Sequence, residues 1–199
     1  MFNRLFALLF LILSLPILAI LYVLVKLDSK GPFIFKQKRA GKDMKPFVMY
    51  KIRTMVKNAQ DLRSKIQHLN ETDDPVFKIR NDPRYTKVGK AISHLGIDEL
   101  PQFINVLKGE MALVGPRPLP MDEAKKVPKK YQARFSVIPG MTSLWLIKGA
   151  HRLTFKEWME LDAEYVERRT WSMDVSIFIT TVLGIIKAVV NKTISGIKV

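Results

Sequence analysis

Two adjacent carboxylates, Asp98 and Glu99, are the residues of this chain best suited to chemistry. They precede apolar residues at helical spacing that stop before Gly109, which predicts a helix over residues 100–108 with both carboxylates at its start. Backbone N–H groups and the helix dipole stabilise anions there, so capping is the ordinary interpretation. A helix start also attracts phosphate, and a carboxylate near phosphate can bind Mg²⁺ or attack phosphorus. The spacing leaves capping and catalysis open.

A stiff basic turn, Pro116-Arg117-Pro118, follows this helix. Arginine suits bidentate phosphate recognition, and a proline on each side would hold its backbone. Lys51 and Arg53 belong to a basic extended segment, where their i, i+2 spacing places both on one side. These five residues form the predicted substrate-binding group.

The elements that must position these residues show a mixed pattern. Residues 33–35 and 46–50 read as short strands joined by a turn at 40–43, which predicts a β-hairpin. Residues 57–75 read as a polar helix followed by a loop. The cluster at 70–75 is acidic enough to suggest a metal site, but Asn, Asp and Thr before a proline favour turn chemistry.

The N-terminus carries an uncharged run of 21 residues, Leu5–Val25. As a helix it would be roughly 31 Å long, close to the thickness of the bilayer hydrocarbon. A signal peptide is the alternative, but the run lacks a small-x-small cleavage site, so a retained anchor is favoured. Pro16 must break the helix hydrogen bonding, and Ser14 could relieve that defect. Both a kinked span and a helix that re-enters the same face fit the spacing.

Charge and composition narrow the partners. The 199 residues carry a net charge of +15 and are 48% hydrophobic, which excludes a disordered basic tail. Nucleic acid, anionic lipid and phosphorylated substrates all fit a basic chain, and the apolar run favours a membrane surface with the basic part on the cytoplasmic side. No cysteine is present, which excludes a thiol nucleophile and a disulfide framework.

A second apolar helix is predicted near the C-terminus, beginning at Trp171. Its apolar face gathers Val175, Phe178, Ile179, Val182, Leu183 and Ile186, with Thr180, Thr181 and Gly184 largely opposite. Ile177 falls on the opposite side, so the amphipathicity is imperfect. A core helix and a helix lying in the membrane interface remain equal alternatives.

Several motifs together resemble one family in chain order. The chain is similar to the bacterial sugar transferases, the monotopic polyprenyl-phosphate phosphoglycosyl transferases, in their small form made of the catalytic domain alone. The resemblance covers nearly the whole chain, at Phe47 to Met55, Asn81 to Arg84, Asp98 to Gln102, Asn105 to Gly109, Gly115 to Pro118, Pro139 to Thr142, Phe155 to Trp158, Leu161-Asp162, Tyr165 to Glu167 and Trp171 to Asp174.

The resemblance implies a reaction. Members of this family transfer a phosphosugar from a nucleotide diphosphate sugar, usually a UDP-sugar, to undecaprenyl phosphate and release the nucleoside monophosphate. It implies Asp98 as the nucleophile that takes the phosphosugar, Glu99 as its partner in metal or proton handling, and Mg²⁺ held by both. It also implies a re-entrant helix broken at Pro16, with the catalytic domain on the cytoplasmic face of a bacterial inner membrane. Expected partners are the two substrates and membrane lipid, and not nucleic acid.

Some family positions differ in this chain. A basic residue common five positions before the nucleophile is Ser93 here, the family's later Gly-Arg becomes Gly149-Ala150, and Leu15 stands where Ser often precedes the helix-breaking proline. His151 or Arg152 could replace the lost cation. Two alternatives therefore stay open: an inactive homologue, and a membrane-tethered protein that binds nucleic acid or anionic lipid.

These inferences predict an α+β fold. It is a mostly helical, membrane-associated catalytic domain with a short β-hairpin. We expect a re-entrant membrane helix over residues 1–28, a cytoplasmic catalytic domain over 29–170, and an amphipathic interfacial helix and tail over 171–199.

Overall fold

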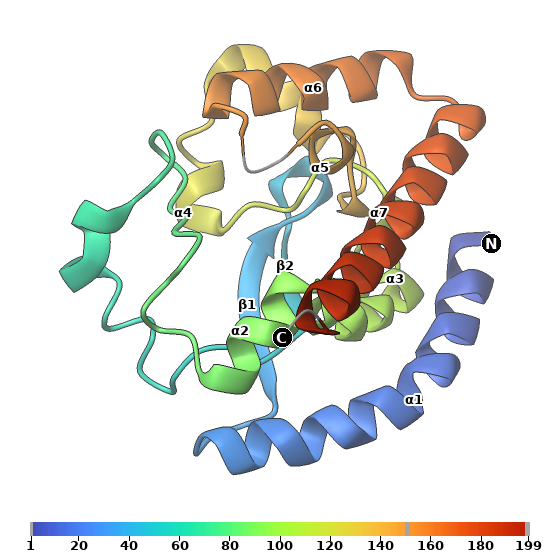
Figure 1. Cartoon of the computed structure of the whole chain (residues 1–199). Coiled ribbons are helices and arrows are strands. Elements are labelled where there is room, and N and C mark those ends of the chain that lie inside the picture. The colour runs from blue at the N-terminus through green and yellow to red at the C-terminus, as the bar shows by residue number, and fades with distance from the viewer. Residues whose placement is uncertain (1, 150–151, 198–199) are drawn as a thin grey trace.

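The computed structural model describes residues 2–149 and 152–197, which form a mixed fold of helices and short strands (Figure 1). A helix lies at each end of the described chain, and the strands lie between them. In chain order the elements are α1 (Phe2–Asp28), β1 (Ile34–Ala40), η1 (Lys42–Met44), β2 (Pro46–Ile52), η2 (Ser64–Leu69), α2 (Lys87–His94), η3 (Ile97–Gln102), α3 (Phe103–Lys108), β3 (Ala112–Val114), α4 (Met121–Ala124), η4 (Lys129–Phe135), β4 (Gly140–Thr142), α5 (Leu144–Ile147), α6 (Phe155–Arg168) and α7 (Trp171–Ile197), where η denotes a 3₁₀ helix.

The predicted hairpin is present and longer than expected. Strands β1 and β2 pair antiparallel along their full length, from Ile34 opposite Ile52 to Ala40 opposite Pro46. A second, parallel pair of strands, β3 and β4, was not predicted. The two backbones approach so closely beside this pair that a Cβ atom on Gly140 would collide with the backbone of Gly115. Glycine is therefore required at the start of β4, and also at Gly115, where the chain enters the Pro-Arg-Pro loop and a Cβ atom would lie 2.6 Å from the Ile138 carbonyl oxygen.

The helix predicted within residues 57–75 is wrong. Residues 57–63 form successive turns, and only the short 3₁₀ helix η2 follows. Leu62, Ile66 and Leu69 fall at helical spacing, but none of the three is buried, so a longer helix would gain little from packing. The loop after η2 agrees with the turn interpretation, because the Asn70 amide donates to the carbonyls of Thr72 and Val76 at 2.7 and 3.1 Å.

Helix α1 packs against the domain through both of its halves. Near the N-terminus Ala7 is fully buried, and Phe10 lies 5.8 Å from the ring of Phe103 on α3. Near the other end Leu21 and Val25 join a buried cluster with Ile52 and Ile92. Figure 1 shows the two halves running in different directions along the domain. The helix is continuous, with Pro16 inside it.

The environment of Pro16 differs in one detail from the expectation. The buried hydroxyl of Ser14 donates to the carbonyl of Leu11 at 2.7 Å, and not to the carbonyl of Ile12 that the proline deprives of a donor. Ser14 therefore satisfies its own buried hydroxyl group within the preceding turn.

Helix α7 contacts the domain through the side predicted to be opposite its apolar face. Ile177 is 2% exposed, and the Asp174 carboxylate accepts a hydrogen bond from the Tyr165 hydroxyl at 2.7 Å. Thr181 shares a hydroxyl hydrogen bond with Thr142 at β4. On the predicted apolar face Phe178 packs partly against the core, whereas Leu183 and Ile186, further along, are 60% and 53% exposed.

Helices α1 and α7 therefore both present apolar surface away from the core. By length and composition, Asn3–Asp28 and Trp171–Ala188 are each sufficient to cross a membrane, and little of either segment is buried. Trp171, at the start of α7, is 73% exposed. Such surface on two neighbouring helices calls for a lipid or protein partner.

Candidate active site

Asp98 and Glu99 lie in the first turn of a 3₁₀ helix. The expected helix over 100–108 is instead divided into η3 and α3, with Pro101 inside η3. Gly96 precedes η3 in the left-handed conformation (φ 70°), and Gly109 ends α3 in the same conformation (φ 80°). The predicted end of the helix is confirmed, and the carboxylates start a helical segment as expected.

Four of the predicted residues meet at this turn. The Lys51 ammonium, on β2, lies 2.7 Å from Glu99 Oε1 and 3.5 Å from Asp98 Oδ2. Arg117 Nη2 lies 2.6 Å from the same oxygen of Glu99. Glu99 therefore stands between two cations, while Asp98, whose side chain is 9% exposed, has only the longer contact with Lys51.

The two neighbouring carboxyl groups have opposite pKa shifts. Burial raises the pKa of Asp98, the Lys51 charge opposes this, and the Glu99 charge adds to it. Burial also disfavours ionisation of Glu99, but the charges of Arg117 and Lys51 outweigh it and hold the pKa of that carboxyl well below its usual range. Glu99 in turn raises the pKa of Arg117. Neighbouring carboxyl groups whose pKa values are shifted in opposite directions are typical of sites in which the two groups have separate chemical roles.

Asn105 on α3 fixes the distance between Lys51 and the carboxylates. Its side chain is fully buried, donates to the carbonyl of Val48 at 2.7 Å and accepts from the backbone N–H of Tyr50 at 3.1 Å. It also donates to Glu110 at 2.7 Å. Asn105 thus joins β2, next to Lys51, to the helix that follows Glu99. The available sequence signal was a polar residue within an apolar helical pattern, and its role was missed.

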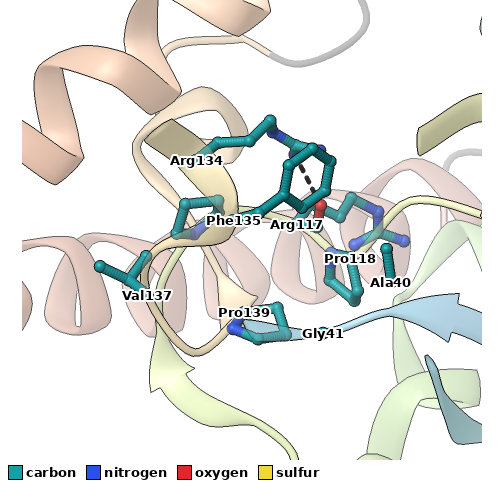
Figure 2. Close-up of a pocket in the computed structure, with 9 residues that line it drawn as sticks. Ala40, Gly41, Arg117, Pro118, Arg134, Phe135, Val137 and Pro139 are labelled. Atoms are coloured by element: carbon teal, nitrogen blue, oxygen red, sulfur yellow. Dashed lines mark hydrogen bonds between the residues drawn. The ribbon is translucent and has the colours of Figure 1, made fainter. Parts of the chain in front are cut away.

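Two arginines, the buried Arg134 and the partly buried Arg39, hold the Pro-Arg-Pro loop from behind. Arg134 Nη2 donates to the carbonyl of Arg117 at 2.8 Å and pairs with Asp162 at 2.7 Å, as Figure 2 shows for the first of these bonds. Arg39 Nη1 donates to the carbonyl of Pro118 at 3.0 Å. The sequence analysis assigned neither arginine a role at the site.

The small pocket in Figure 2 is the space between this loop and its supports. Pro116, Pro118 and Arg134 line it, and its volume of about 10 Å³ is close to the lower limit for one water molecule. The two prolines line this pocket and not the large cavity next to the carboxylates. Their position favours holding Arg117 over direct contact with a substrate.

Arg53 is not part of the carboxylate group. Its guanidinium donates to the carbonyls of Pro32 and Ser29 at 2.6 and 2.8 Å and to the Ser29 hydroxyl, just after α1. Arg53 lies beyond the end of β2. The i, i+2 alternation of the strand therefore does not apply to it, and its side chain reaches a different place from that of Lys51. It anchors the connection between the membrane-length helix and the hairpin.

The family departures fall in different places. The Ser93 hydroxyl lies 3.1 Å from the Tyr85 hydroxyl and lines the large cavity. Ala150 and His151 lie outside the described residues.

A cavity of about 1050 Å³ opens beside the carboxylates. Asp98, Glu99, Lys51 and Arg117 lie in its wall, and more of its lining is apolar than polar. The other side of the wall comes from helix α7, including residues 180–182 and 184–186. The cavity therefore extends from a charged turn to an apolar helix, and its volume is sufficient for a substrate with both characters.

Mg²⁺ fits the donor chemistry of this turn. Asp98 and Glu99 supply the oxygen ligands that Mg²⁺ prefers, and Asp98 is a buried carboxylate whose charge is incompletely balanced. Among the described residues no group of three or more His, Asp or Glu side chains could form a complete ligand set. Mg²⁺ commonly completes its ligands with water and substrate phosphate, so two carboxylates are sufficient.

A carboxylate pair, with Asp98 buried and Glu99 partly buried, that faces a lysine and an arginine defines a site suited to phosphate chemistry. The chain belongs to the bacterial sugar transferase family, whose model matches residues 1–188. The resemblance inferred from the motifs is therefore confirmed.

Named relatives agree with this family. The chain is 43% identical over 153 residues to "Galactosyl transferase CpsE" of Streptococcus agalactiae serotype III, covering 76% of this chain and 34% of the relative. It is 38% identical over 197 residues to the "UDP-glucose:undecaprenyl-phosphate glucose-1-phosphate transferase" of Escherichia coli K12, covering 94% and 39%. It is 31% identical over 185 residues to the "Exopolysaccharide production protein ExoY" of Rhizobium meliloti, covering 91% and 82%. The chain thus spans between a third and two fifths of the first two of these relatives, and most of the third.

Proposed function

We propose that this chain transfers a phosphosugar from a UDP-sugar to undecaprenyl phosphate and releases UMP. The observation that carries the proposal is the contact of Lys51 and Arg117 with the Asp98-Glu99 pair in the wall of a large cavity. The names of the relatives, which include glucose and galactose phosphotransferases acting on undecaprenyl phosphate, support the same reaction class. The product would begin the assembly of a glycoconjugate on its lipid carrier.

In the first step an oxygen of Asp98 attacks the sugar-linked phosphorus. A bond forms between this oxygen and phosphorus, and the bond from phosphorus to the bridging oxygen breaks. The electron pair stays on the bridging oxygen, which departs as part of UMP. In the second step an oxygen of undecaprenyl phosphate attacks the same phosphorus and frees the Asp98 carboxylate, which gives ping-pong kinetics.

The surrounding residues bind and orient the substrate. Arg117 faces the diphosphate with a guanidinium suited to two phosphate oxygens. Glu99 remains ionised and holds Lys51 and Arg117 in place through one oxygen. Lys51 also contacts Asp98, where its charge favours the reactive carboxylate form. Mg²⁺, when bound by Asp98 and Glu99, would neutralise diphosphate charge.

We further propose a monotopic arrangement at the cytoplasmic face of the bacterial inner membrane. Both halves of α1 pack on the same domain, which is difficult to combine with a helix whose two ends emerge on opposite sides of a bilayer. The exposed apolar faces of α1 and α7 would enter the lipid, and the basic domain would remain near anionic headgroups. A polyprenyl chain could then stay in lipid while its phosphate reaches the cavity.

The decisive experiment compares wild type with Asp98→Asn in detergent or vesicles containing undecaprenyl phosphate and Mg²⁺. A panel of UDP-sugars is assayed for UMP release, and intact-protein mass spectrometry measures the covalent phosphosugar. We expect wild type to form the adduct with at least one donor, and Asp98→Asn to lose adduct and turnover by at least about 10³-fold.

Asp122→Asn is the matched control, because this carboxylate is exposed (65%) and lies outside the site. It should retain wild-type activity. Normal turnover by Asp98→Asn would refute the mechanism. Absence of UMP release from every donor, together with salt-sensitive binding to nucleic acid or anionic vesicles, would favour the tethered binding protein.

A further inference from the structure

The cavity holds more positive charge than its own carboxylates balance. Of the cations in its wall, Arg84 is paired with Asp82 at 2.7 Å, and Lys51 and Arg117 are paired with the catalytic carboxylates. Lys78 and Arg39 also line the cavity. Neither forms a salt bridge within 4.0 Å with any carboxylate in residues 2–149 and 152–197. Two cations are therefore available to an anion that enters.

Lys78 is held in place by its backbone and by an aromatic ring. Its N–H donates to the Asn70 side chain at 2.7 Å, and its carbonyl accepts from the N–H of Glu71 at 2.9 Å. The ammonium lies 5.2 Å from the ring centre of Trp145, which stacks on Trp158 with ring centres 4.3 Å apart. This support fixes the position of the charge without neutralising it.

Arg39 approaches from β1. Two of its nitrogens donate to Pro118 and Gln37, and its buried Nε has no hydrogen-bond partner among the described residues. The like charge of Arg117 lowers the pKa of both Arg39, to about 10, and Lys78, to about 8, with burial as the larger cause in each. The charges of Glu123 and Glu99 oppose this effect on Arg39, and that of Glu71 opposes it on Lys78. A cavity wall that gathers Arg117, Arg39 and Lys78 is typical of an anion site.

The order of the charges separates this cluster from the reacting carboxylate. Arg117 pairs with Glu99 at 2.6 Å, Arg39 donates to the carbonyl of the next residue, Pro118, at 3.0 Å, and Lys78 lines the same cavity. Arg117 therefore lies next to the carboxylate pair through its side chain and next to the backbone contact of Arg39 through the chain. A diphosphate that spans Arg117 would place one phosphate at Asp98 and the other toward Lys78 and Arg39.

We propose that Lys78 and Arg39, with Arg117, form a subsite for the nucleoside-side phosphate of the donor, the group that departs as nucleoside monophosphate. This inference rests on the proposed function and assigns its leaving-group site. When the bridging bond breaks, the departing phosphate gains one negative charge. Cations fixed beside it stabilise that charge and would favour the first step of the reaction over the second.

Lys78→Met tests the subsite, because Arg39 also supports the Pro-Arg-Pro loop and its removal would have two effects. UMP alone is titrated into wild type, Lys78→Met and Lys78→Arg by calorimetry. We expect Lys78→Met to bind UMP at least about tenfold more weakly and Lys78→Arg to retain most of the affinity. Lys126→Met removes an exposed lysine outside the cavity and should bind UMP as wild type does.

Single-turnover kinetics test which step the subsite serves. Lys78→Met should slow UMP release and raise the KM for the UDP-sugar, while preformed adduct reacts with undecaprenyl phosphate at the wild-type rate. Three results would overturn the subsite: unchanged UMP binding in Lys78→Met, no UMP binding by wild type, or a raised KM for undecaprenyl phosphate with normal UMP binding. Thermal denaturation checks that the variants are folded. If Lys78→Arg also bound UMP weakly, Lys78 would have a structural role, and this result would count against the proposal.

The two proposals fail in different ways. Wild-type turnover with normal UMP binding by Lys78→Met would remove the subsite and leave the proposed function intact. Absence of turnover with every nucleotide sugar would remove the proposed function, whatever the UMP affinity.

Discussion

At the scale of single residues, the neighbours Asp98 and Glu99 have different ionisation because their partners differ. One oxygen of Glu99 accepts from both Lys51 and Arg117, whereas Asp98 is buried and has one longer contact, with Lys51 at 3.5 Å. Glu99 is therefore suited to organising the cations, and Asp98 to reacting. A nucleophilic carboxylate must be ionised, so the raised pKa of Asp98 should appear in the pH dependence of the first step.

Glu99→Gln should move that pH dependence. The Glu99 charge raises the pKa of Asp98, and its removal also frees Lys51 to approach Asp98, so both effects lower this pKa. Activity rises with pH as Asp98 ionises. The acid limb of UMP release should therefore shift to lower pH, while the maximal rate falls at least about tenfold because Arg117 loses its partner.

The measurement is single-turnover UMP release across about pH 4 to 8. Glu160→Gln, which changes an exposed carboxylate (52%), serves as the control and should leave the profile unchanged. A limb that stays in place or moves to higher pH in Glu99→Gln would contradict the assigned electrostatics.

At the scale of elements, the site depends on contacts between segments that are distant in the sequence. Strand β2 supplies Lys51, η3 supplies the carboxylates, and the loop after β3 supplies Arg117. Asn105 joins the first two, and Arg134 with Asp162 supports the third from η4 and α6. Buried polar groups with satisfied hydrogen bonds hold such an arrangement in one geometry.

Asn105→Ala should separate the first two elements. It leaves the Val48 carbonyl, the Tyr50 N–H and the Glu110 carboxylate without a bond they now make. The free energy of unfolding should fall by about 2–4 kcal/mol, and activity should fall because Lys51 is no longer fixed beside Glu99. Urea unfolding followed by tryptophan fluorescence measures the first effect, with the exposed Asn58→Ala as control. A loss below about 1 kcal/mol would show that water replaces these bonds.

At the scale of the whole molecule, the two long helices present their apolar faces outward. The largest exposed apolar side chains include Leu5, Leu13, Ile20 and Leu27 on α1 and Ile179, Leu183 and Ile186 on α7. Both helices remain attached to the domain by packing and hydrogen bonds on their other sides. A protein built in this way would sit on a lipid surface at a fixed depth, which suits a lipid-linked substrate.

The absence of cysteine allows a direct test of topology. Asn3→Cys and Lys30→Cys introduce single thiols at the two ends of α1. In sealed vesicles of known orientation, a membrane-impermeant maleimide should label both from the same side if the helix re-enters. Labelling from opposite sides would instead establish a kinked span and overturn the monotopic arrangement. Lys126→Cys on the domain reports which side is cytoplasmic.

Much of the fold could be predicted where the signal is local. The hairpin, the helix end at Gly109 and the long apolar helix follow from alternation, turn residues and hydropathy over a few consecutive residues. The polar segment 57–75 was mistaken for a helix because polarity alone does not distinguish a solvated helix from a series of turns. The parallel pair β3–β4 was missed because its three-residue strands carry little pattern and pair with residues far along the chain.

The sequence by itself determined the chemical groups of this protein: an Asp-Glu pair, a rigid arginine turn, one apolar helix of membrane length, and no thiol. It also determined the family, because those motifs occur in order along the chain. Only the tertiary structure decided which cations reach the carboxylates. Lys51 does and Arg53 does not, although they are two residues apart, because β2 ends between them. The Lys51 ammonium contacts Glu99, whereas the Arg53 guanidinium donates to the carbonyl of Pro32. Side-chain distances and the unpaired charges of Lys78 and Arg39 depend on contacts between distant segments, which local patterns do not encode.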